Sequence, residues 1–336
     1  MTTRWKTTAD TTVNRNKSVL LNSTTPQLHN STTPQLLNST TVTFAIFGNS
    51  YQQHKAVSTG HLLQLLRRQD ADVMIDREYS MFLQSIGINE AKDYPVFCAG
   101  DFHADFAFSM GGDGTMLRTA ARVGSKEIPI VGVNMGRLGF LADIRPDELA
   151  EAVNALYVGQ YVKERRAIIS VEADGQPLSP YPTAINDVAV LKRDSASMIT
   201  IHTQADGEHQ ISYQADGVIV STSTGSTAYS LSNGGPIIVP GSGVLCITAV
   251  APHSLNMRPI VLPEMRELTF DVESRSHGFL VAIDGRAEKL HVGTRITLRR
   301  ADFSCYVVKR QGSSYFTTLK EKMMWGADTR SEKKQW

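Results

Sequence analysis

The segment Gly111-Gly112-Asp113-Gly114-Thr115 places a carboxylate inside a glycine turn. The apolar run 106–110 predicts a strand before the turn, and a helical pattern continues after it through Leu117. Glycines let a backbone approach phosphate closely, and a helix N-terminus offers unpaired N–H groups. Because a carboxylate repels phosphate, we interpret Asp113 as a general base for a hydroxyl that attacks phosphorus. The structural alternative is a helix N-cap.

A run of small hydroxyl residues and glycines from 216 to 230, followed by Gly234-Gly235-Pro236, forms a second candidate site. Tyr229 can stack on a base, while neighbouring hydroxyl and N–H groups bind ribose and phosphate. A plain Ser/Thr turn in a β domain is the alternative, but such turns seldom stay this small and polar for so long. The run therefore favours nucleotide binding.

Two further loops carry polar groups. Asn186-Asp187 precedes an apolar strand, and such a pair either contacts an adenine edge or ribose hydroxyls, or forms an Asx-turn. The glycine-spaced loop 134–141 follows a buried strand and either borders the site or bends the chain between domains. For this loop we favour the bend.

The elements that position these residues fall into two patterns. Strand-like runs alternate with helical patterns in residues 42–145, which predicts a Rossmann-like α/β domain with a parallel sheet. A helix is expected at 146–157, and short strand-like runs then dominate residues 146–310, which predicts a mainly β domain. In residues 311–336 we expect a helix that packs back on the first domain, followed by a tail.

Residues 1–41 differ in composition from the rest of the chain. A polar Asn/Ser/Thr/Pro unit repeats with a period of eight residues and buries little apolar area, which predicts a disordered extension. Its few basic residues leave an organelle transit peptide as the alternative.

Composition limits the classes of partner. The 336 residues carry 34 basic and 33 acidic side chains, so no long-range field draws the chain to nucleic acid or to an anionic membrane. Three distant cysteines argue against a disulfide framework or a zinc site of the usual kind. The sequence has no apolar run of membrane-spanning length and no secretory signal. We therefore expect a cytoplasmic protein.

Taken together and in this order, the motifs resemble those of the NAD kinase family over roughly residues 42–326. The resemblance implies an NAD kinase/diacylglycerol kinase-like fold. It also implies transfer of a phosphoryl group from ATP to the 2′-hydroxyl of the adenosine ribose of NAD, which gives NADP. Mg²⁺ is expected to accompany ATP. Family members of this type are homo-oligomers, commonly dimers or tetramers, with sites completed across an interface.

The resemblance also assigns roles to individual residues. It makes Asp113 the general base and implies that Asp216 reaches a ligand of a neighbouring subunit. Asp187 stands where many members have Glu, and Arg286 where many have Gln. The full set of residues implied to contact nucleotide is Asp113, Gly114, Arg118, Asn186, Asp187, Gln214, Asp216, Thr227, Ala228, Tyr229, Ser230, Leu231, Ser232 and Arg286. No side chain is assigned as a resident metal ligand.

Other functions remain as alternatives. A diacylglycerol- or sphingosine-type lipid kinase shares the loop 111–115, and a non-catalytic dinucleotide sensor would keep the 227–232 run but dispense with Asp113. An NADH-oxidising dehydrogenase is disfavoured because the GxGxxG pattern is missing. The sequence does not distinguish ATP from polyphosphate as the donor.

Overall fold

The computed structural model describes residues 41–50, 57–136, 139–194 and 197–324, without the side chains of residues 209 and 210. These residues belong to one unit, Leu36–Trp336. The predicted disorder of residues 1–40 and the tail after the C-terminal helix lie outside the described residues, as do residues 137 and 138 of the glycine-spaced loop.

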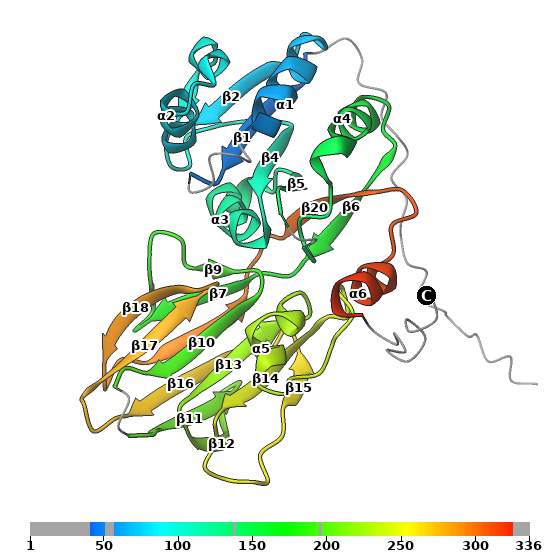
Figure 1. Cartoon of the computed structure of the whole chain (residues 1–336). Helices are drawn as coiled ribbons and strands as arrows, with labels where there is room; N and C mark the ends of the chain where they lie inside the picture. The colour runs from blue at the N-terminus through cyan, green and yellow to red at the C-terminus, as the bar shows by residue number, and fades with distance from the viewer. Residues whose placement is uncertain (1–40, 51–56, 137–138, 195–196, 325–336) are drawn as a thin grey trace, which may run out of the picture. The chain divides into compact units, whose positions relative to one another are not determined.

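The α/β part is built on a seven-stranded sheet (Figure 1). Its order is β3-β2-β1-β4-β5-β20-β6; all pairs are parallel except β20 with β6. The strands are β1 (Thr43–Gly48), β2 (Asp72–Asp76), β3 (Val96–Phe97), β4 (Phe106–Gly111), β5 (Ile130–Asn134), β6 (Tyr161–Arg166) and β20 (Cys305–Arg310). The predicted parallel sheet is confirmed.

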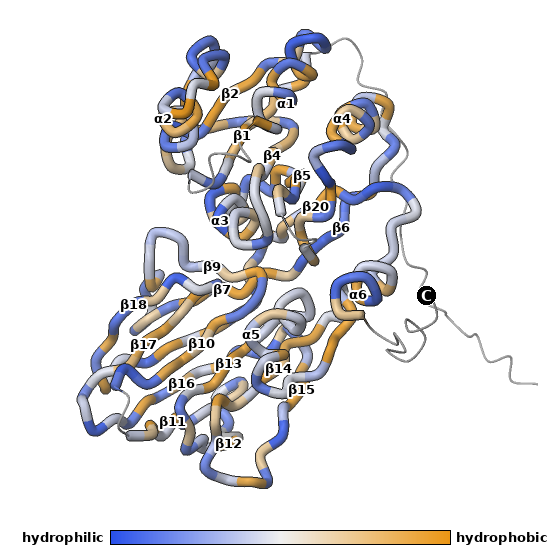
Figure 2. The backbone as a smooth tube through the Cα atoms, in the orientation of Figure 1, coloured by the Kyte–Doolittle hydropathy of each residue, from blue (hydrophilic) through white to orange (hydrophobic). Residues whose placement is uncertain are grey.

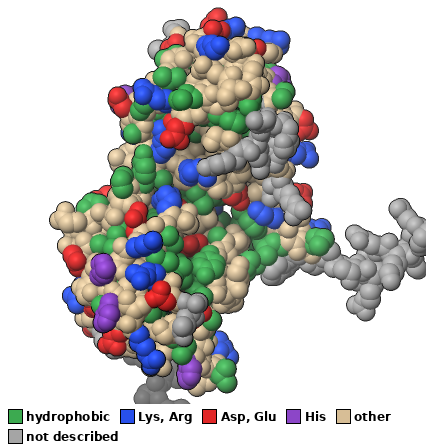
Figure 3. Space-filling view, turned by 60° about the vertical axis from the view of Figure 1, so that its left-hand side comes forward, with side chains coloured by type: hydrophobic (Ala, Val, Ile, Leu, Met, Phe, Trp, Pro, Cys, Tyr) green, Lys and Arg blue, Asp and Glu red, His purple; other side chains and the backbone are tan. Residues whose placement is uncertain are grey.

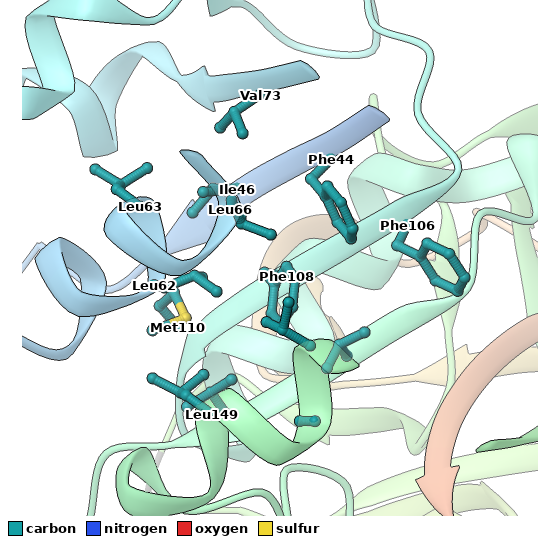
Figure 4. Packing of buried hydrophobic residues seen from close by; sticks show 14 of the residues in the cluster. Phe44, Ile46, Leu62, Leu63, Leu66, Val73, Phe106, Phe108, Met110 and Leu149 are labelled. Carbon is teal, nitrogen blue, oxygen red and sulfur yellow. The ribbon is translucent and has the colours of Figure 1, made fainter. Parts of the chain in front are cut away.

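Side chains alternate along these strands between two cores, as period-two geometry requires. Phe44 and Ile46 face a core shared with Leu62 and Leu149, whereas Ala45 and Phe47 face a core shared with Met116 (Figure 4). The helices that cover the sheet are α1 (Val57–Arg67), α2 (Arg77–Ser85), α3 (Asp113–Val123) and α4 (Leu149–Tyr157). Because α3 directly follows β4, its N-terminus lies at the carboxyl edge of the sheet, where open α/β sheets bind ligands.

The sheets divide the chain differently from the predicted boundaries at residues 145 and 310. The segments α4, β6 and β20 were expected in the β domain, but they join the first sheet or its core. The physical reason lies in β20, which is apolar on both faces: Val307 packs into one core and Val308 into the other. The sequence pattern also missed α2 altogether.

The second part of the chain is a sandwich of two antiparallel sheets. One has the order β15-β14-β13-β10-β17-β18 and the other β12-β11-β16-β19-β7-β8, with β9 paired to β7. Their facing sides share one hydrophobic core. The strands are β7 (Ile169–Ala173), β8 (Gln176–Pro177), β9 (Thr183–Ala184), β10 (Asp187–Lys192), β11 (Ile199–Ala205), β12 (Glu208–Ala215), β13 (Gly217–Thr222), β14 (Val244–Val250), β15 (Ile260–Pro263), β16 (Leu268–Glu273), β17 (Gly278–Ile283), β18 (Arg286–His291) and β19 (Ile296–Arg300). The predicted β architecture is confirmed.

The remaining helices are short. They are α5 (Tyr229–Ser232), α6 (Tyr315–Met323) and the 3₁₀ turns Asn89–Asp93, Gly124–Lys126, Pro146–Glu148 and Gly225–Thr227. Hydrophobic residues occur in the strands and also in α1, α2 and α4, as Figure 2 shows. On the face drawn in Figure 3, acidic and basic side chains are interspersed, in keeping with the net charge of +1. In the part of the chain that the structure describes, no helix is long and apolar enough to cross a membrane.

Candidate active site

Asp113 is the first residue of α3, and the N-cap position belongs to Gly112, which makes no side-chain capping bond. The N-cap interpretation of Asp113 is therefore wrong. Its carboxylate instead accepts N–H bonds from the loop that follows β5: Oδ2 from Phe140 at 2.9 Å, and Oδ1 from Leu141 at 3.1 Å and Ala142 at 3.0 Å. The side chain is 29% exposed, so substrate can still reach it.

The loop after β5 fits against Asp113 because residue 139 is glycine. A Cβ atom at Gly139 would lie 2.0 Å from Oδ1 of Asp113 and 2.8 Å from the carbonyl oxygen of Ala142. The described part of the loop therefore borders the site, and our preference for a mere bend between domains is corrected. The reason is that an Asp side chain 27 to 29 residues earlier in the sequence collects the loop's N–H groups.

A buried ion pair between Lys309 and Asp143 stabilises the same loop. Lys309 on β20 is 5% exposed, and its Nζ donates to the carbonyl of Leu141 at 3.0 Å and lies 2.9 Å from Oδ2 of Asp143. Asn134 at the end of β5 donates to the carbonyl of Ala142 at 3.2 Å. The loop thus gives N–H groups to Asp113 and the carbonyl of Leu141 to Lys309.

Helix α6 adds a side-chain cation to the site. Nζ of Lys322 lies 3.4 Å from Oδ2 of Asp113 and 4.4 Å from the centre of the Phe140 ring. Tyr315, at the start of α6, also packs on Phe140, with ring centres 6.4 Å apart. These contacts place α6 beside the loop that follows β5.

A cavity of about 390 Å³ joins α3 to the β-sandwich. It is lined by Leu117, Asn186, Asp187, Ala189, Leu191, Ala228, Tyr229, Ala282, Asp284 and Gly285. Leu117 lies four residues after Asp113 on α3, so the two side chains share one helix face about 6 Å apart along the axis. The cavity and the carboxylate of Asp113 are therefore neighbours.

The floor of this cavity is flat and apolar. Ala189 on β10 and Ala282 on β17 are paired in register, and they point away from the sandwich core because their neighbours Val188, Val190 and Val281 point into it. Two alanines side by side leave room for a planar ring. Tyr229 at the cavity wall is 40% exposed and can cover that ring.

The carboxylate of Asp284, in a β-hairpin turn, stabilises the polar end of the cavity. Asp284 and Gly285 form the two-residue loop between β17 and β18, with φ values of 47° and 80°, as a type I′ turn requires. The Asp284 carboxylate accepts N–H bonds from Ile185 at 2.9 Å, Asn186 at 2.9 Å and Asp187 at 3.1 Å. This clamp fixes the backbone that presents Asn186 and Asp187.

Burial raises the pKa of both carboxyls. For Asp187, which is 7% exposed, burial and the negative charge of Asp284 raise the pKa to about 7, while the N–H of Tyr229 opposes the rise. Burial also raises the pKa of Asp284, against its three N–H bonds. Asp187 thus changes charge near neutral pH inside the cavity.

The hydroxyl-rich run is locked to Asn186 through its backbone. Thr222 donates its N–H to the carbonyl of Asn186 at 2.9 Å and its hydroxyl to the carbonyl of Ile185. A Cβ at Gly225 would lie 2.0 Å from the carbonyl oxygen of Asn186, so only glycine fits there. Several hydroxyls of this run therefore build the site rather than face a ligand.

Of the fourteen residues expected at the nucleotide, the cavity brings together Asn186, Asp187, Ala228 and Tyr229. Ser230 is fully buried and shares a hydrogen bond of 2.9 Å with Thr248. Thr227, Leu231 and Ser232 continue the same turn without lining the cavity. Gly114 is exposed beside Asp113, and a Cβ there would meet nothing within 4 Å.

The other expected residues lie outside this cavity. Arg118 lines a second cavity of about 490 Å³, which also includes Gly48 and Asp76 at the ends of β1 and β2. Gln214 lines a third cavity, and Asp216 forms an ion pair of 2.7 Å with Lys192.

Arg286 does not line the nucleotide cavity either. It donates to the carbonyls of Tyr181 at 3.3 Å and Thr183 at 2.9 Å. Burial lowers the pKa of its guanidinium, whereas the charge of Asp284 raises it.

Sequence reasoning missed the backbone donors of residues 140–142, Lys309, Lys322 and the apolar floor. The sequence did contain a signal for the apolar floor. The strand that follows Asn186-Asp187 has a small residue, Ala189, on its outward face, and a small side chain there leaves space for a ligand. No local signal marks Lys309; Lys322 lies in the stretch 319–326 that contributes to the family resemblance, but the resemblance gave it no role. Among the described residues, no group of three or more His, Cys, Asp or Glu side chains is arranged to hold a metal ion.

Two solved structures share this fold. Yeast NADH kinase complexed with NADH has a TM-score of 0.75 at 21% identity, covering 86% of this chain and 89% of that one. An NAD kinase from Archaeoglobus fulgidus in complex with ATP has a TM-score of 0.63 at 25% identity, covering 84% and 98%.

Sequence comparisons reach the level of the family. The ATP-NAD kinase N-terminal domain matches residues 9–161 and the ATP-NAD kinase C-terminal domain matches residues 185–310. The NAD kinase of Bacteroides fragilis is 52% identical over 287 residues, covering 85% of this chain and 99% of its own length. That of Cytophaga hutchinsonii is 37% identical, covering 86% and 99%. The chain belongs to the ATP-NAD kinase family, a family of phosphotransferases, and the resemblance seen in the motifs is confirmed.

Proposed function

We propose that this chain phosphorylates the 2′-hydroxyl of the adenosine ribose of NAD with ATP and releases NADP and ADP. The observation that carries the proposal is the cavity that joins Leu117 of α3 to Asn186, Asp187 and Tyr229. It offers an apolar floor for adenine and polar groups for ribose, one helical turn from Asp113. The fold and the family relationship support the same activity.

In this proposal Asp113 is the general base. A ribose hydroxyl is a poor nucleophile at neutral pH, and a positioned base contributes roughly 10²–10⁴-fold. Oδ1 is occupied by two N–H donors, whereas Oδ2 accepts one N–H and faces Lys322 and solvent. We assign Oδ2 as the oxygen that receives the proton.

The donor is proposed to bind on the other side of α3. The second cavity lies at the carboxyl ends of β1 and β2, the usual ligand position of a parallel sheet. Its lining includes the side chains of Arg77 and Arg118, which suit the charge of a triphosphate. The described acidic residues form no metal cluster, so Mg²⁺ would enter with ATP, held mainly by phosphate oxygens. Bound there, it would offset phosphate charge.

Oligomerisation is proposed from the two residues that lie apart from the nucleotide cavity. Gln214 lies on the edge strand β12 and Asp216 directly after it, and in our proposal they complete the site of a neighbouring subunit in a dimer or tetramer. We also propose a cytoplasmic location. The lipid kinase alternative is not favoured, because the curated relatives that match over nearly their whole length are NAD kinases.

The direct test is incubation of purified protein with NAD, ATP and Mg²⁺, followed by quantification of NADP and ADP. Equal amounts of NADP and ADP support the proposal. Diacylglycerol and NADP serve as alternative acceptors in parallel reactions. Phosphorylation of diacylglycerol in place of NAD would contradict the proposal, as would phosphorylation of NADP at the rate of NAD.

A further inference from the structure

Lys322 on α6 is separated from Asp113 by 209 residues of sequence, yet it is the side chain that approaches the proposed base. Its Nζ lies 3.4 Å from Oδ2, the oxygen that we assign to receive the proton. The helix is anchored by Leu319, which is 6% exposed, and by the contact of Tyr315 with Phe140. The ammonium is thus delivered to the reacting carboxylate by a fixed element.

The contact is loose enough to be exchanged. At 3.4 Å it is longer than a strong charge-assisted hydrogen bond, and the Lys322 side chain is 31% exposed. The ring of Phe140 lies 4.4 Å from the same ammonium and can hold it as the carboxylate partner changes. Lys322 can therefore pivot on Phe140 without leaving the site.

The reaction brings two negatively charged groups together at Asp113. As the hydroxyl attacks, a phosphoryl group with negative oxygens comes within a few ångströms of the carboxylate that removes the proton. Two negative charges about 4 Å apart repel each other strongly at the dielectric of a protein surface. A cation beside both groups offsets that repulsion, and it does so most where charge gathers in the transition state.

We infer that Lys322 is a catalytic residue whose ammonium binds the non-bridging oxygens of the transferred phosphoryl group and then the 2′-phosphate of the product. This inference rests on the proposed function. The 2′-oxygen forms a bond to the γ-phosphorus, and the bond from that phosphorus to the β,γ-bridging oxygen breaks. The hydroxyl proton passes to Oδ2 of Asp113 and then to solvent, and ADP leaves with the bridging oxygen.

If Lys322 binds the 2′-phosphate, its loss should weaken the binding of NADP more than the binding of NAD. NAD has no 2′-phosphate, so its affinity depends on the cavity around Asn186 and Tyr229. NADP places a phosphate beside Asp113, where it needs Lys322. A hydrogen bond to a charged group is worth about 1.5–3 kcal/mol, which corresponds to roughly ten- to a hundredfold in affinity.

The test compares Lys322→Met, Lys322→Arg and the control Lys320→Met. Lys320 lies on the same helix and is exposed. Calorimetry with NAD and with NADP gives the ratio of their affinities without any turnover. We expect Lys322→Met to bind NAD normally, to lose NADP affinity about tenfold or more, and to lose turnover about a hundredfold. Lys322→Arg should lie between, and Lys320→Met should match the wild-type protein.

Two results would overturn the inference. One is an unchanged NAD-to-NADP affinity ratio in Lys322→Met; the other is turnover within threefold of the Lys320→Met control. If Lys322→Met does not fold, Lys322→Gln also removes the charge but keeps a polar end, and a wild-type NAD-to-NADP affinity ratio in that variant would overturn the inference. Failure of the proposed function itself is seen separately, as absence of NADP formation by the wild-type protein.

Discussion

Asp187 and Asp284 are joined by two hydrogen bonds, one from main chain to carboxylate and one from main chain to main chain. The carboxylate of Asp284 accepts the N–H of Asp187 at 3.1 Å, and the N–H of Asp284 donates to the carbonyl of Asp187 at 3.0 Å. Burial raises the pKa of both carboxyls, and the negative charge of Asp284 raises that of Asp187 further. The pair therefore fixes the cavity's geometry and makes its charge depend on pH.

The first prediction concerns stability and pH in Asp187→Asn. The pKa of Asp187 is about 7 in the folded chain, against 3.8 when unperturbed, so the native state holds the proton more tightly between these values. Its contribution to stability is fully present below pH 3.8 and is lost as pH rises through 7. Asn cannot ionise. We expect the variant to gain stability relative to wild type between pH 5 and pH 8, by a few kcal/mol at most.

Urea unfolding at both pH values measures the difference. Asp101→Asn, a change at an exposed acid, is the control and should show no such trend. A gap between Asp187→Asn and wild type that does not widen from pH 5 to pH 8 would show that Asp187 is ionised at both.

The second prediction concerns Gly139→Ala. The new Cβ would overlap the carboxylate of Asp113, so the loop or the carboxylate must move. Displacement of about 1 Å in a reacting group costs on the order of a hundredfold in rate. We expect turnover to fall by about that factor while NAD affinity changes little. Gly60→Ala on α1, where the nearest atom is 3.8 Å from the new Cβ, is the matched control.

The third prediction concerns Lys309 as a positioning residue. Lys309→Met keeps the buried stem but removes the support of Leu141 and leaves Asp143 without its cation. Breaking one partner of a buried pair typically costs about 3–5 kcal/mol. We expect lower stability and roughly a tenfold lower kcat, with the KM for NAD nearly unchanged. The double variant with Asp143→Asn should recover stability but not kcat; recovery of both would mean that the pair has no role in positioning.

Some features of this fold and site follow from local sequence patterns, and others depend on contacts between distant segments. The glycine turn, the strand after Asn186 and the alternation of helix and strand are local patterns, and the structure follows them. The bonds from residues 140–142 to Asp113, and the approach of Lys309 and Lys322, join distant segments. They depend on how β20 and α6 return to the first sheet, which no local pattern encodes. For Ser230 the local pattern was misleading: it suggested a hydroxyl that contacts a ligand, but that hydroxyl is buried and bonded to Thr248.

The fourth prediction concerns the donor cavity. Arg118 is exposed on α3 and its guanidinium contacts Thr115 at 3.2 Å, without an acidic partner among the described residues. Arg118→Met should raise the KM for ATP about tenfold, by loss of a charge-assisted phosphate contact, and leave the KM for NAD within twofold. Arg68→Met, an exposed change after α1, serves as the control. Equal increases in both KM values would place Arg118 at the shared site instead.

The last prediction concerns Asp113→Asn. An amide cannot act as a base, and here it also cannot reproduce the carboxylate's bonds. If its oxygen faces Leu141 and Ala142, its NH₂ group faces the N–H of Phe140 and the ammonium of Lys322, so donors oppose donors. We therefore expect turnover to fall at least roughly a hundredfold, the lower end of the range for a general base, with a modest loss of thermal stability.

Affinity for NAD in Asp113→Asn should stay near wild type, because Asn186, Asp187 and Tyr229 line a cavity about one helical turn away. Turnover, melting temperature and calorimetry with NAD are measured on one preparation. Gly139→Ala perturbs the same loop without removing the carboxylate, so it separates the cost of disturbing the loop from the loss of the base. If Asp113→Asn is no slower than Gly139→Ala, the carboxylate acts only by holding the loop. If it loses NAD binding in proportion to rate, Asp113 binds the substrate and a different group takes the proton.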